Sequence, residues 1–372
     1  MGRPLNRLTL RGFKSIKSLE DFEFRSLNVM VGANGSGKSN LVSFFQMLRA
    51  MSEEGLASFV AESGGADGFF FNGPKETPEI SAHLKFGPNE YMFTLVPTAS
   101  VQLMVKAESH FFRRWTNFGG GTTESRLKQW KDDKSSFFPT SPGVGAYIYS
   151  AVSSWVVYHF HDTSARAPMR RDQSVRDWRE LNPDASNIAS FLLRLRTQDE
   201  GSYSSIRETI QLVAPFFDDF LLEPERMGEN EVVRLEWRQK GSSFPFQPWQ
   251  LSDGTIRFMC LTTALLQPNP PSTIVIDEPE LGLHPFALEV LAGSLRDAAV
   301  RTQLIISTQS ATLLNHFDAE DVIVVDRKNG HSAFRRLDAM SLSDWAKDYT
   351  LGELWQKNVF DGGPSHEGAS AR

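Results

Sequence analysis

A glycine-rich segment near the N-terminus constrains the fold of this chain more than any other feature. Residues 32–39 read Gly-Ala-Asn-Gly-Ser-Gly-Lys-Ser and match the pattern G-x-x-x-x-G-K-[ST]. The apolar residues 27–31 predict a buried strand before the segment, and apolar spacing across 38–51 predicts an amphipathic helix after it. This order of strand, loop and helix is typical of a phosphate-binding loop, whereas an ordinary glycine turn rarely ends in Lys-Ser.

The chemistry of the loop assigns roles to its residues. Glycines let backbone N–H groups curl around phosphate oxygens, and the helix start adds positive potential. Lys38 is expected to reach the β- and γ-phosphates and to take part in catalysis, while the Ser39 hydroxyl is expected to ligate Mg²⁺. The cofactors predicted are therefore ATP and Mg²⁺. The predicted cofactor-binding residues of the loop are Gly32, Ala33, Asn34, Gly35, Ser36, Gly37, Lys38, Ser39 and Asn40.

A second apolar strand, predicted at 273–276, ends in the acidic run Asp277-Glu278-Pro279-Glu280. Open α/β sheets place ligand-binding groups at such strand ends. We expect Asp277 to hold Mg²⁺ through water and Glu278 to polarise the attacking water as a general base. An acidic strand end alone is more often a helix N-cap or a solvated turn, so this interpretation depends on the phosphate loop.

These motifs resemble those of a known class of proteins. Residues 277–285, Asp-Glu-Pro-Glu-Leu-Gly-Leu-His-Pro, look like the Walker B motif and D-loop of the ABC-class ATPases that include SMC, RecF and OLD proteins, especially the AAA21-type stand-alone predicted ATPases. Residues 11–15, Arg-Gly-Phe-Lys-Ser, are typical of the N-terminal strand of that class. OLD-type relatives carry a nuclease domain after the ATPase. Too few residues follow Val325 for such a domain, so we expect any nuclease or effector to be a separate chain.

The resemblance implies a site that a second copy completes. Residues 251–258 resemble the signature motif, in which a serine and backbone amides bind the γ-phosphate held by the other protomer. Ser252, Asp253 and Gly254 are therefore expected to bind nucleotide. Ser252 is a good N-cap, Gly254 allows close backbone approach, and the following helix points its dipole at an anion, although Ser-Asp-Gly-Thr is also a common capped turn. A homodimer or higher homo-oligomer formed through the ATP sites follows from the resemblance.

Gln309 follows a predicted strand at 303–307, at a position where many relatives carry a histidine that contacts the γ-phosphate. An amide can donate a hydrogen bond to phosphate but cannot change its charge near neutral pH. We expect Gln309 to sense nucleotide in the catalytic site without acting as acid or base, which is compatible with a low rate of hydrolysis.

The order of predicted elements gives the fold class. We predict an α/β fold, an ABC-type P-loop NTPase head built from both chain ends, with an α+β insertion that includes a short helical arm. The expected boundaries are 1–98 and 242–360 for the two parts of the head, 99–241 for the inserted arm or lid, and 361–372 for a disordered tail rich in Gly, Ser and Ala.

Composition and charge exclude several other classes. The net charge of -6 gives no global footprint for nucleic acid. The single Cys260 lies in an apolar run, which predicts a buried, inert thiol. No apolar segment approaches the ~20 residues that span a bilayer, and the first seven residues lack the hydrophobic stretch of a signal peptide. We therefore expect a cytoplasmic protein without membrane contact.

Two further groups of residues leave alternatives open. His159, His161 and Asp162 invite a metal site, but strand alternation separates Asp162 from the histidines and favours a satisfied polar turn. Basic and aromatic residues gather in two places and could bind a phosphate backbone and stack bases, but acidic neighbours favour a solvated helical face. They are Arg166, Arg170, Arg171, Arg176, Trp178 and Arg179 in one group, and Arg113, Arg114 and Trp115 in the other.

The function expected from these observations is MgATP-dependent switching of a dimer. One hypothesis is an ATPase motor or clamp that acts on DNA, in repair or in defence against phage. The other is a slow nucleotide-gated scaffold that regulates a separately encoded nuclease or toxin. The sequence does not choose between them.

Overall fold

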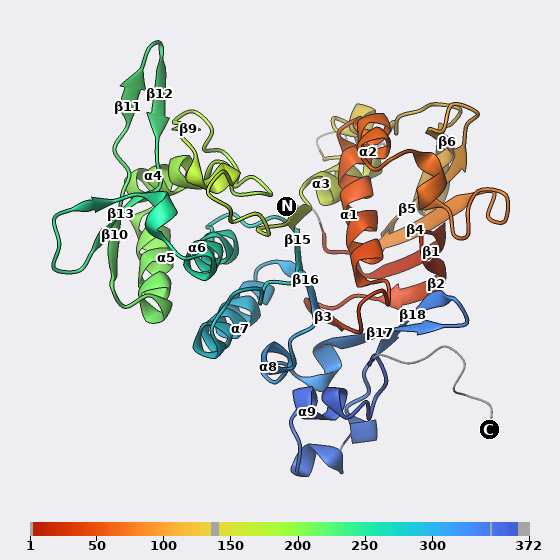
Figure 1. Cartoon of the computed structure of the whole chain (residues 1–372). Coiled ribbons are helices and arrows are strands. Elements are labelled where there is room, and N and C mark those ends of the chain that lie inside the picture. The colour runs from red at the N-terminus through yellow and green to blue at the C-terminus, as the bar shows by residue number, and fades with distance from the viewer. Residues whose placement is uncertain (1–2, 135–140, 343, 364–372) are drawn as a thin grey trace.

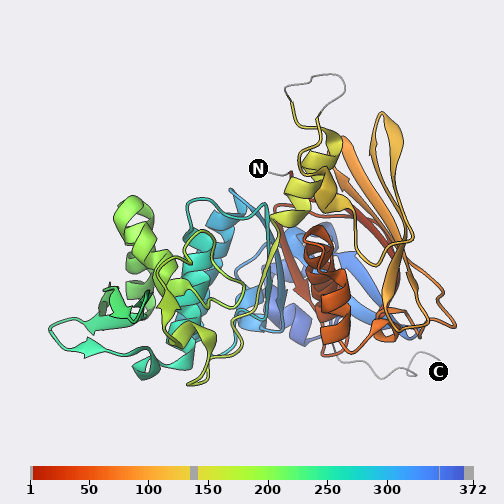
Figure 2. The same cartoon turned by 90° about the horizontal axis from the view of Figure 1, so that it is seen from above.

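Helix α1 (Lys38–Ser52) lies between two six-stranded sheets, as seen from two directions in Figures 1 and 2. This is a computed structural model, and it describes residues 3–134, 141–342 and 344–363. The apolar stripe of α1 is fully buried: Phe44 meets the Phe13 ring edge-on at 5.5 Å, and Phe45 meets Trp155 at 5.2 Å. The predicted strand, loop and helix are therefore confirmed.

The first sheet is parallel except at one edge, and it joins segments from both chain ends. Its strand order is β18-β17-β3-β16-β15-β8, and β18 alone runs antiparallel. Every residue of β3 and β16 is buried, as expected for strands covered on both faces. The head is thus built from both ends of the chain. The strands are β3 (Leu27–Val31), β8 (Val156–Tyr158), β15 (Thr273–Asp277), β16 (Gln303–Thr308), β17 (Val322–Lys328) and β18 (His331–Arg336).

The second sheet is entirely antiparallel, in the order β2-β1-β4-β5-β6-β7. Strand β4 alternates between buried and partly exposed residues, and the buried face of the sheet packs against α1. The strands are β1 (Arg7–Phe13), β2 (Ile16–Glu23), β4 (Ile80–Phe86), β5 (Asn89–Pro97), β6 (Leu103–Phe112) and β7 (Arg114–Gly119).

Strand pairing runs across the boundary expected at residue 99. Strands β6 and β7 extend the antiparallel sheet, α3 (Val144–Ser153) contacts α1, and β8 pairs with β15 in the parallel sheet. The physical reason is that Leu103 and Val105 continue the buried face of β5 and share its core. The separate lobe begins only after β8.

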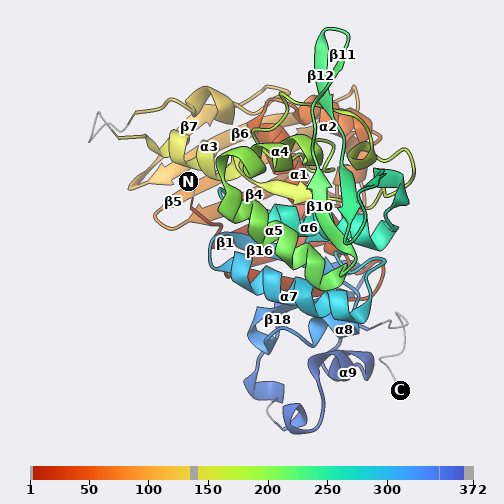
Figure 3. The ribbon, with the colours of Figure 1, turned by 90° about the vertical axis from the view of Figure 1, so that its left-hand side faces the viewer.

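The lobe packs against one side of the parallel sheet and carries a hairpin, β11–β12, that projects outward in Figure 3. Two helices, α4 and α5, are separated at Asp199, whose side chain caps the second helix by accepting from Ser202 N at 3.1 Å. The lobe comprises α4 (Ile188–Gln198), α5 (Glu200–Val213), α6 (Asp253–Leu266), β9 (Gln173–Ser174), β10 (Phe217–Leu221), β11 (Glu225–Met227), β12 (Asn230–Val233), β13 (Glu236–Gln239) and β14 (Pro245–Phe246).

The remaining helices include one beside the lobe and two near the C-terminal end. Helix α7 contacts both α6 and β16, and α8 contacts α9. No helix in the described ranges is long and apolar enough to cross a membrane. Cys260 is fully buried, and burial raises the pKa of its thiol. Residues 364–372 of the expected tail lie outside the described residues. These helices are α2 (Leu56–Glu62), α7 (Pro285–Ala299), α8 (Ala311–Leu314) and α9 (Leu351–Gln356), with short 3-10 helices at Ala66–Phe69, Leu127–Trp130, Pro168–Arg170, Pro248–Gln250, Ala319–Asp321, Met340–Leu342 and Trp345–Lys347.

Candidate functional site

The glycine-rich loop occupies the carboxyl end of β3 and the start of α1. Gly37 is the residue before the helix, and its φ of 115° lies in the left-handed region that favours glycine. A Cβ at Gly37 would also collide with the Ser332 hydroxyl of β18. The loop conformation thus depends on glycine at this position.

A chain of hydrogen bonds supports the loop from outside. Asn40 Nδ2 donates to Ser15 Oγ at 2.6 Å, and the Ser15 and Ser332 hydroxyls share a hydrogen bond of 2.6 Å. Ser332 Oγ then donates to the Ser36 carbonyl oxygen at 2.6 Å. Asn40, predicted to bind nucleotide, therefore uses its amide to support the loop. Ser332 had no sequence signal, because it meets the loop only through the pairing of β17 with β18.

Lys38 is buried against the loop. Its Nζ donates to the carbonyl oxygens of Gly32 at 2.7 Å and Ala33 at 3.2 Å. Desolvation lowers the pKa of Lys38, and the charges of Glu278 and Asp277 oppose that shift. The ammonium and the acidic end of β15 therefore interact electrostatically, although about 240 residues separate them in the sequence.

The acidic strand end offers oxygen atoms without protein partners. Asp277 Oδ1 and the Oγ of its strand neighbour Ser307 are buried and have no hydrogen-bond partner among the described residues. A buried acceptor without a donor is unfavourable, and a carboxylate oxygen is a ligand that Mg²⁺ or its bound water favours. Ser39 is exposed at the start of α1. The residues present therefore fit a hydrated magnesium ion.

The predicted base and the predicted sensor are in direct contact. Gln309 Nε2 donates to Glu278 Oε1. Glu278 has a left-handed backbone with φ of 47°, and its N–H donates to the Ser307 carbonyl oxygen at 2.8 Å. Strained backbone at a strand end is typical of functional sites and persists only where neighbouring contacts fix it. The structure thus brings Glu278 and Gln309 together at the ends of adjacent strands.

Glu280 is a further residue of this site that the sequence interpretation left without a role. Its Oε1 accepts from Thr308 Oγ1 and from Gln309 N, both at 2.8 Å, while its Oε2 is buried without a partner among the described residues. Burial raises the pKa of Glu280 although these hydrogen bonds oppose the shift. The acidic run itself was the available signal.

The signature-like turn lies apart from the loop of its own chain. Ser252 caps α6 by accepting from Thr255 N at 3.1 Å, and both Ser252 and Asp253 are exposed. A Cβ at Gly254 would collide with the Gly282 carbonyl oxygen, so the turn packs closely against the segment after β15. In the described residues, no hydrogen bond or ion pair joins this turn to residues 32–40.

The histidine-containing segment after β8 links the two regions. His161 Nε2 donates to the Asp277 carbonyl oxygen at 3.0 Å. The Arg257 guanidinium of α6 donates to the carbonyl oxygens of Phe160 at 2.9 Å, His161 at 3.1 Å and Leu281. Within the described chain, no three His, Cys, Asp or Glu residues are placed to hold a metal ion. The polar-turn interpretation fits this segment better than the metal site.

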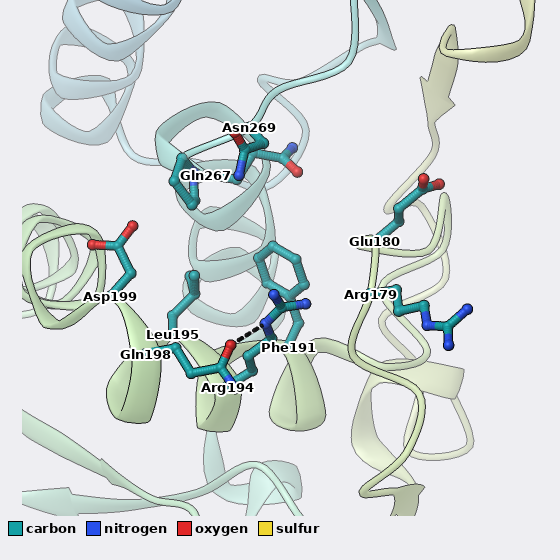
Figure 4. Close-up of a pocket in the computed structure, with 10 residues that line it drawn as sticks. Arg179, Glu180, Phe191, Arg194, Leu195, Gln198, Asp199, Gln267 and Asn269 are labelled. Carbon is teal, nitrogen blue, oxygen red and sulfur yellow. Dashed lines mark hydrogen bonds between the residues drawn. The ribbon is translucent and has the colours of Figure 1, made fainter.

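The first basic group does not form a single helical face. Arg170 is buried, donates to the Thr163 carbonyl oxygen at 3.0 Å and pairs with Asp253 at 3.0 Å. Arg179 instead lines a pocket of about 280 Å³ between α4 and the end of α6 (Figure 4). None of the predicted nucleotide-binding residues lines this pocket. Its residues are Arg179, Glu180, Phe191, Arg194, Leu195, Gln198, Asp199, Gln267, Pro268 and Asn269.

The fold and the arrangement of its motifs define an ABC-type P-loop ATPase head of the SMC/RecF-like group. The family model described as "AAA domain, putative AbiEii toxin, Type IV TA system" matches residues 27–99 and 107–315. The chain therefore belongs to this AAA_21 family.

Solved structures of SMC heads share the fold. An SMC head crystallised with the C-terminal winged-helix domain of ScpA is 16% identical, with a TM-score of 0.60 over 92% of this chain and 99% of that chain. An SMC head from Pyrococcus furiosus, with an extended coiled coil and the C-terminal domain of ScpA bound, is 14% identical, with a TM-score of 0.56 over 93% and 99%. No protein with a curated description matches the sequence.

Proposed function

We propose that the chain binds MgATP at residues 32–39 and hydrolyses it in a site that a second copy completes. One observation carries this proposal. The phosphate loop, the acidic strand end and Gln309 follow the adjacent parallel strands β3, β15 and β16, whereas the exposed signature-like turn lies outside that group. The turn can bind an anion because it lies at a helix N-terminus, but it is not next to the phosphate loop of its own chain. Its chemistry therefore favours contact with a phosphate that a second copy holds.

The residues of one chain divide the chemistry among them. Backbone N–H groups of the loop and the Lys38 ammonium would hold the β- and γ-phosphates. Ser39 and, through water, Asp277 would hold Mg²⁺, which neutralises charge on the phosphates when bound. Glu278 would accept a proton from the attacking water, and Gln309 would fix the carboxylate of Glu278. A neutral amide in that position supports slow hydrolysis.

Exposed apolar side chains around the signature-like turn favour a protein partner at this surface. Trp249, just before the turn, is 61% exposed, and Phe286, just after the D-loop segment, is 51% exposed. Leu281 is also exposed, and its carbonyl oxygen accepts from Arg257 of α6. Aromatic residues beside a polar binding motif are typical of interfaces. If a second copy faced this surface, Ser252 and Gly254 of the first copy would contact the nucleotide bound to the second copy.

We propose a cytoplasmic switch in DNA repair or in defence against phage, with DNA as a partner. The second candidate is a slow scaffold for a separate nuclease, toxin or other effector, and the neutral Gln309 beside Glu278 favours it. The SMC heads that share this fold were crystallised with a domain of ScpA, a separate protein. Strong stimulation of ATP turnover by DNA supports the first setting, and stable ATP-bound assembly with little turnover supports the second.

Ser252→Arg is expected to leave MgATP affinity of the isolated protomer within about twofold and to abolish ATP-dependent assembly and hydrolysis. The Ser252 side chain caps α6 and is exposed, so an arginine would project into the surface proposed for the second copy. Calorimetry measures binding, and light scattering with and without MgATP measures assembly. Ser205→Arg, on an exposed face of α5, is the matched control. Normal hydrolysis by monomeric Ser252→Arg would rule out the paired site.

A further inference from the structure

Glu280 connects the two strand ends that carry the proposed base and sensor. Its Oε1 accepts hydrogen bonds from the Thr308 hydroxyl and from the Gln309 backbone N–H, both in the 308–309 segment. Two neighbouring donors on one carboxylate oxygen restrain that segment strongly, because hydrogen bonds to a charged acceptor are stronger than neutral ones. Thr308 Oγ1 in turn accepts from Ser310 N at 3.0 Å, which continues the restraint into α8.

The same segment also reaches back to Glu278, so a closed ring forms. Gln309 is held at its backbone by Glu280 and donates from its side chain to Glu278 Oε1. Glu278 N donates to the Ser307 carbonyl oxygen at 2.8 Å, and the buried Pro279 separates the two glutamates. Proline fixes its own φ, so the spacing between the two carboxylates is restrained at both ends.

Resting on the function proposed above, we propose that Glu280 is a positioning residue: it fixes the Gln309 backbone so that the Gln309 amide holds Oε1 of Glu278. Among the described residues, no hydrogen bond reaches Glu278 Oε2. Glu278 Oε2 is therefore the oxygen available to accept a proton from water. Because Oε1 and Oε2 belong to one carboxylate, the hydrogen bond from Gln309 to Oε1 also sets the direction in which Oε2 points. Glu280 acts through Gln309 and needs no contact with the nucleotide.

Two substitutions separate positioning from simple space filling. Glu280→Gln keeps the length of the side chain and an acceptor oxygen at its end. The Gln309 N–H and the Thr308 hydroxyl should therefore both keep a hydrogen-bond acceptor. Glu280→Leu keeps a similar volume but leaves the Gln309 N–H and the Thr308 hydroxyl without that partner. Glu289 is exposed on α7, and Glu289→Gln is the matched control for loss of a carboxylate elsewhere.

Hydrogen exchange of the full chain without nucleotide tests the contact directly. In Glu280→Leu, exchange at residues 308–310 should rise about tenfold, as expected for the loss of about one hydrogen bond. Glu280→Gln and Glu289→Gln should stay within about threefold of wild type. If Glu280→Leu does not fold, Thr308→Val removes one donor to the carboxylate and should give a smaller rise at the Gln309 amide. Unchanged exchange at 308–310 in the folded Leu variant, or at the Gln309 amide in Thr308→Val where Leu does not fold, overturns the proposal.

ATP turnover then tests whether the contact acts through Gln309. Glu280→Leu should lower kcat by about tenfold with the MgATP dissociation constant within about threefold, and Glu280→Gln should restore most of the rate. Gln309→Ala should lower kcat in wild type and have little further effect in Glu280→Leu. Fully additive effects would assign Glu280 a separate role and overturn the proposal. A wild-type chain that binds no MgATP would instead overturn the proposed function, while hydrogen exchange still decides the position of Gln309.

Discussion

Lys38→Ala should lower the affinity for MgATP by at least about 100-fold, which corresponds to about 2.7 kcal/mol. The ammonium lies against the loop with hydrogen bonds to the Gly32 and Ala33 carbonyl oxygens, at the position where the β- and γ-phosphates would bind. Charge-assisted hydrogen bonds to phosphate contribute about 1.5–3 kcal/mol each, so their loss accounts for the expected effect. Isothermal calorimetry with MgATP measures it.

The control for this substitution is another lysine of the same head. Lys17 is exposed on β2 and lies outside residues 32–39, so Lys17→Ala removes an equal charge from a side chain that is not part of the loop. Its MgATP affinity should equal that of wild type. Circular dichroism establishes that Lys38→Ala is folded, since the Gly32 carbonyl oxygen loses a partner. A folded Lys38→Ala with wild-type affinity would refute the assignment of residues 32–39 as the phosphate loop.

Glu278→Gln should lower kcat by about 10²- to 10⁴-fold, the usual contribution of a general base. An amide keeps the size of the side chain and can still accept from Gln309 Nε2, but it cannot take a proton from water. MgATP binding should therefore survive, and the ATP-bound assembly should accumulate. Single-turnover measurements give the rate, and light scattering with MgATP gives the size.

Two comparisons make the result for Glu278 specific. Glu289→Gln, on the exposed face of α7, should hydrolyse ATP at the wild-type rate. Glu278→Gln should remain larger with MgATP than with MgADP, because only the triphosphate has the γ-phosphate that the second copy would contact. Full turnover by Glu278→Gln would exclude Glu278 as the base.

The structural elements that depend on residues close together in the sequence could be predicted. The strand, loop and helix around Lys38 follow from apolar spacing and glycine placement, and Ser252 was predicted as an N-cap because its hydroxyl serves its own helix. Apolar periodicity alone does not indicate the break at Asp199, because it continues from α4 into α5 across the capping residue.

Contacts between distant segments could not be predicted in the same way. Alternation shows which face of a strand is buried but not which strand it pairs with, so β6–β8 were placed in an insertion. Arg170 was grouped with surface arginines, yet it is buried, and several of its acceptors, such as the Leu251 carbonyl oxygen, lie about 80 residues away in the sequence. The role of Ser332 and the contact of Glu280 with Gln309 could not be predicted for the same reason, because each joins segments that are distant in the sequence.

The central claim is that each active site combines the phosphate loop of one copy with the signature-like turn of another. Mixing Ser252→Arg with Lys38→Ala tests it most directly, because neither variant alone should hydrolyse ATP. A mixed dimer would contain one site with both defects and one with neither. Each mixed dimer has one intact site of two, so hydrolysis should return in proportion to the fraction of mixed dimers, to at most about half of wild type. A mixture that stays inactive, although both variants are folded and associate with each other, would contradict the paired site.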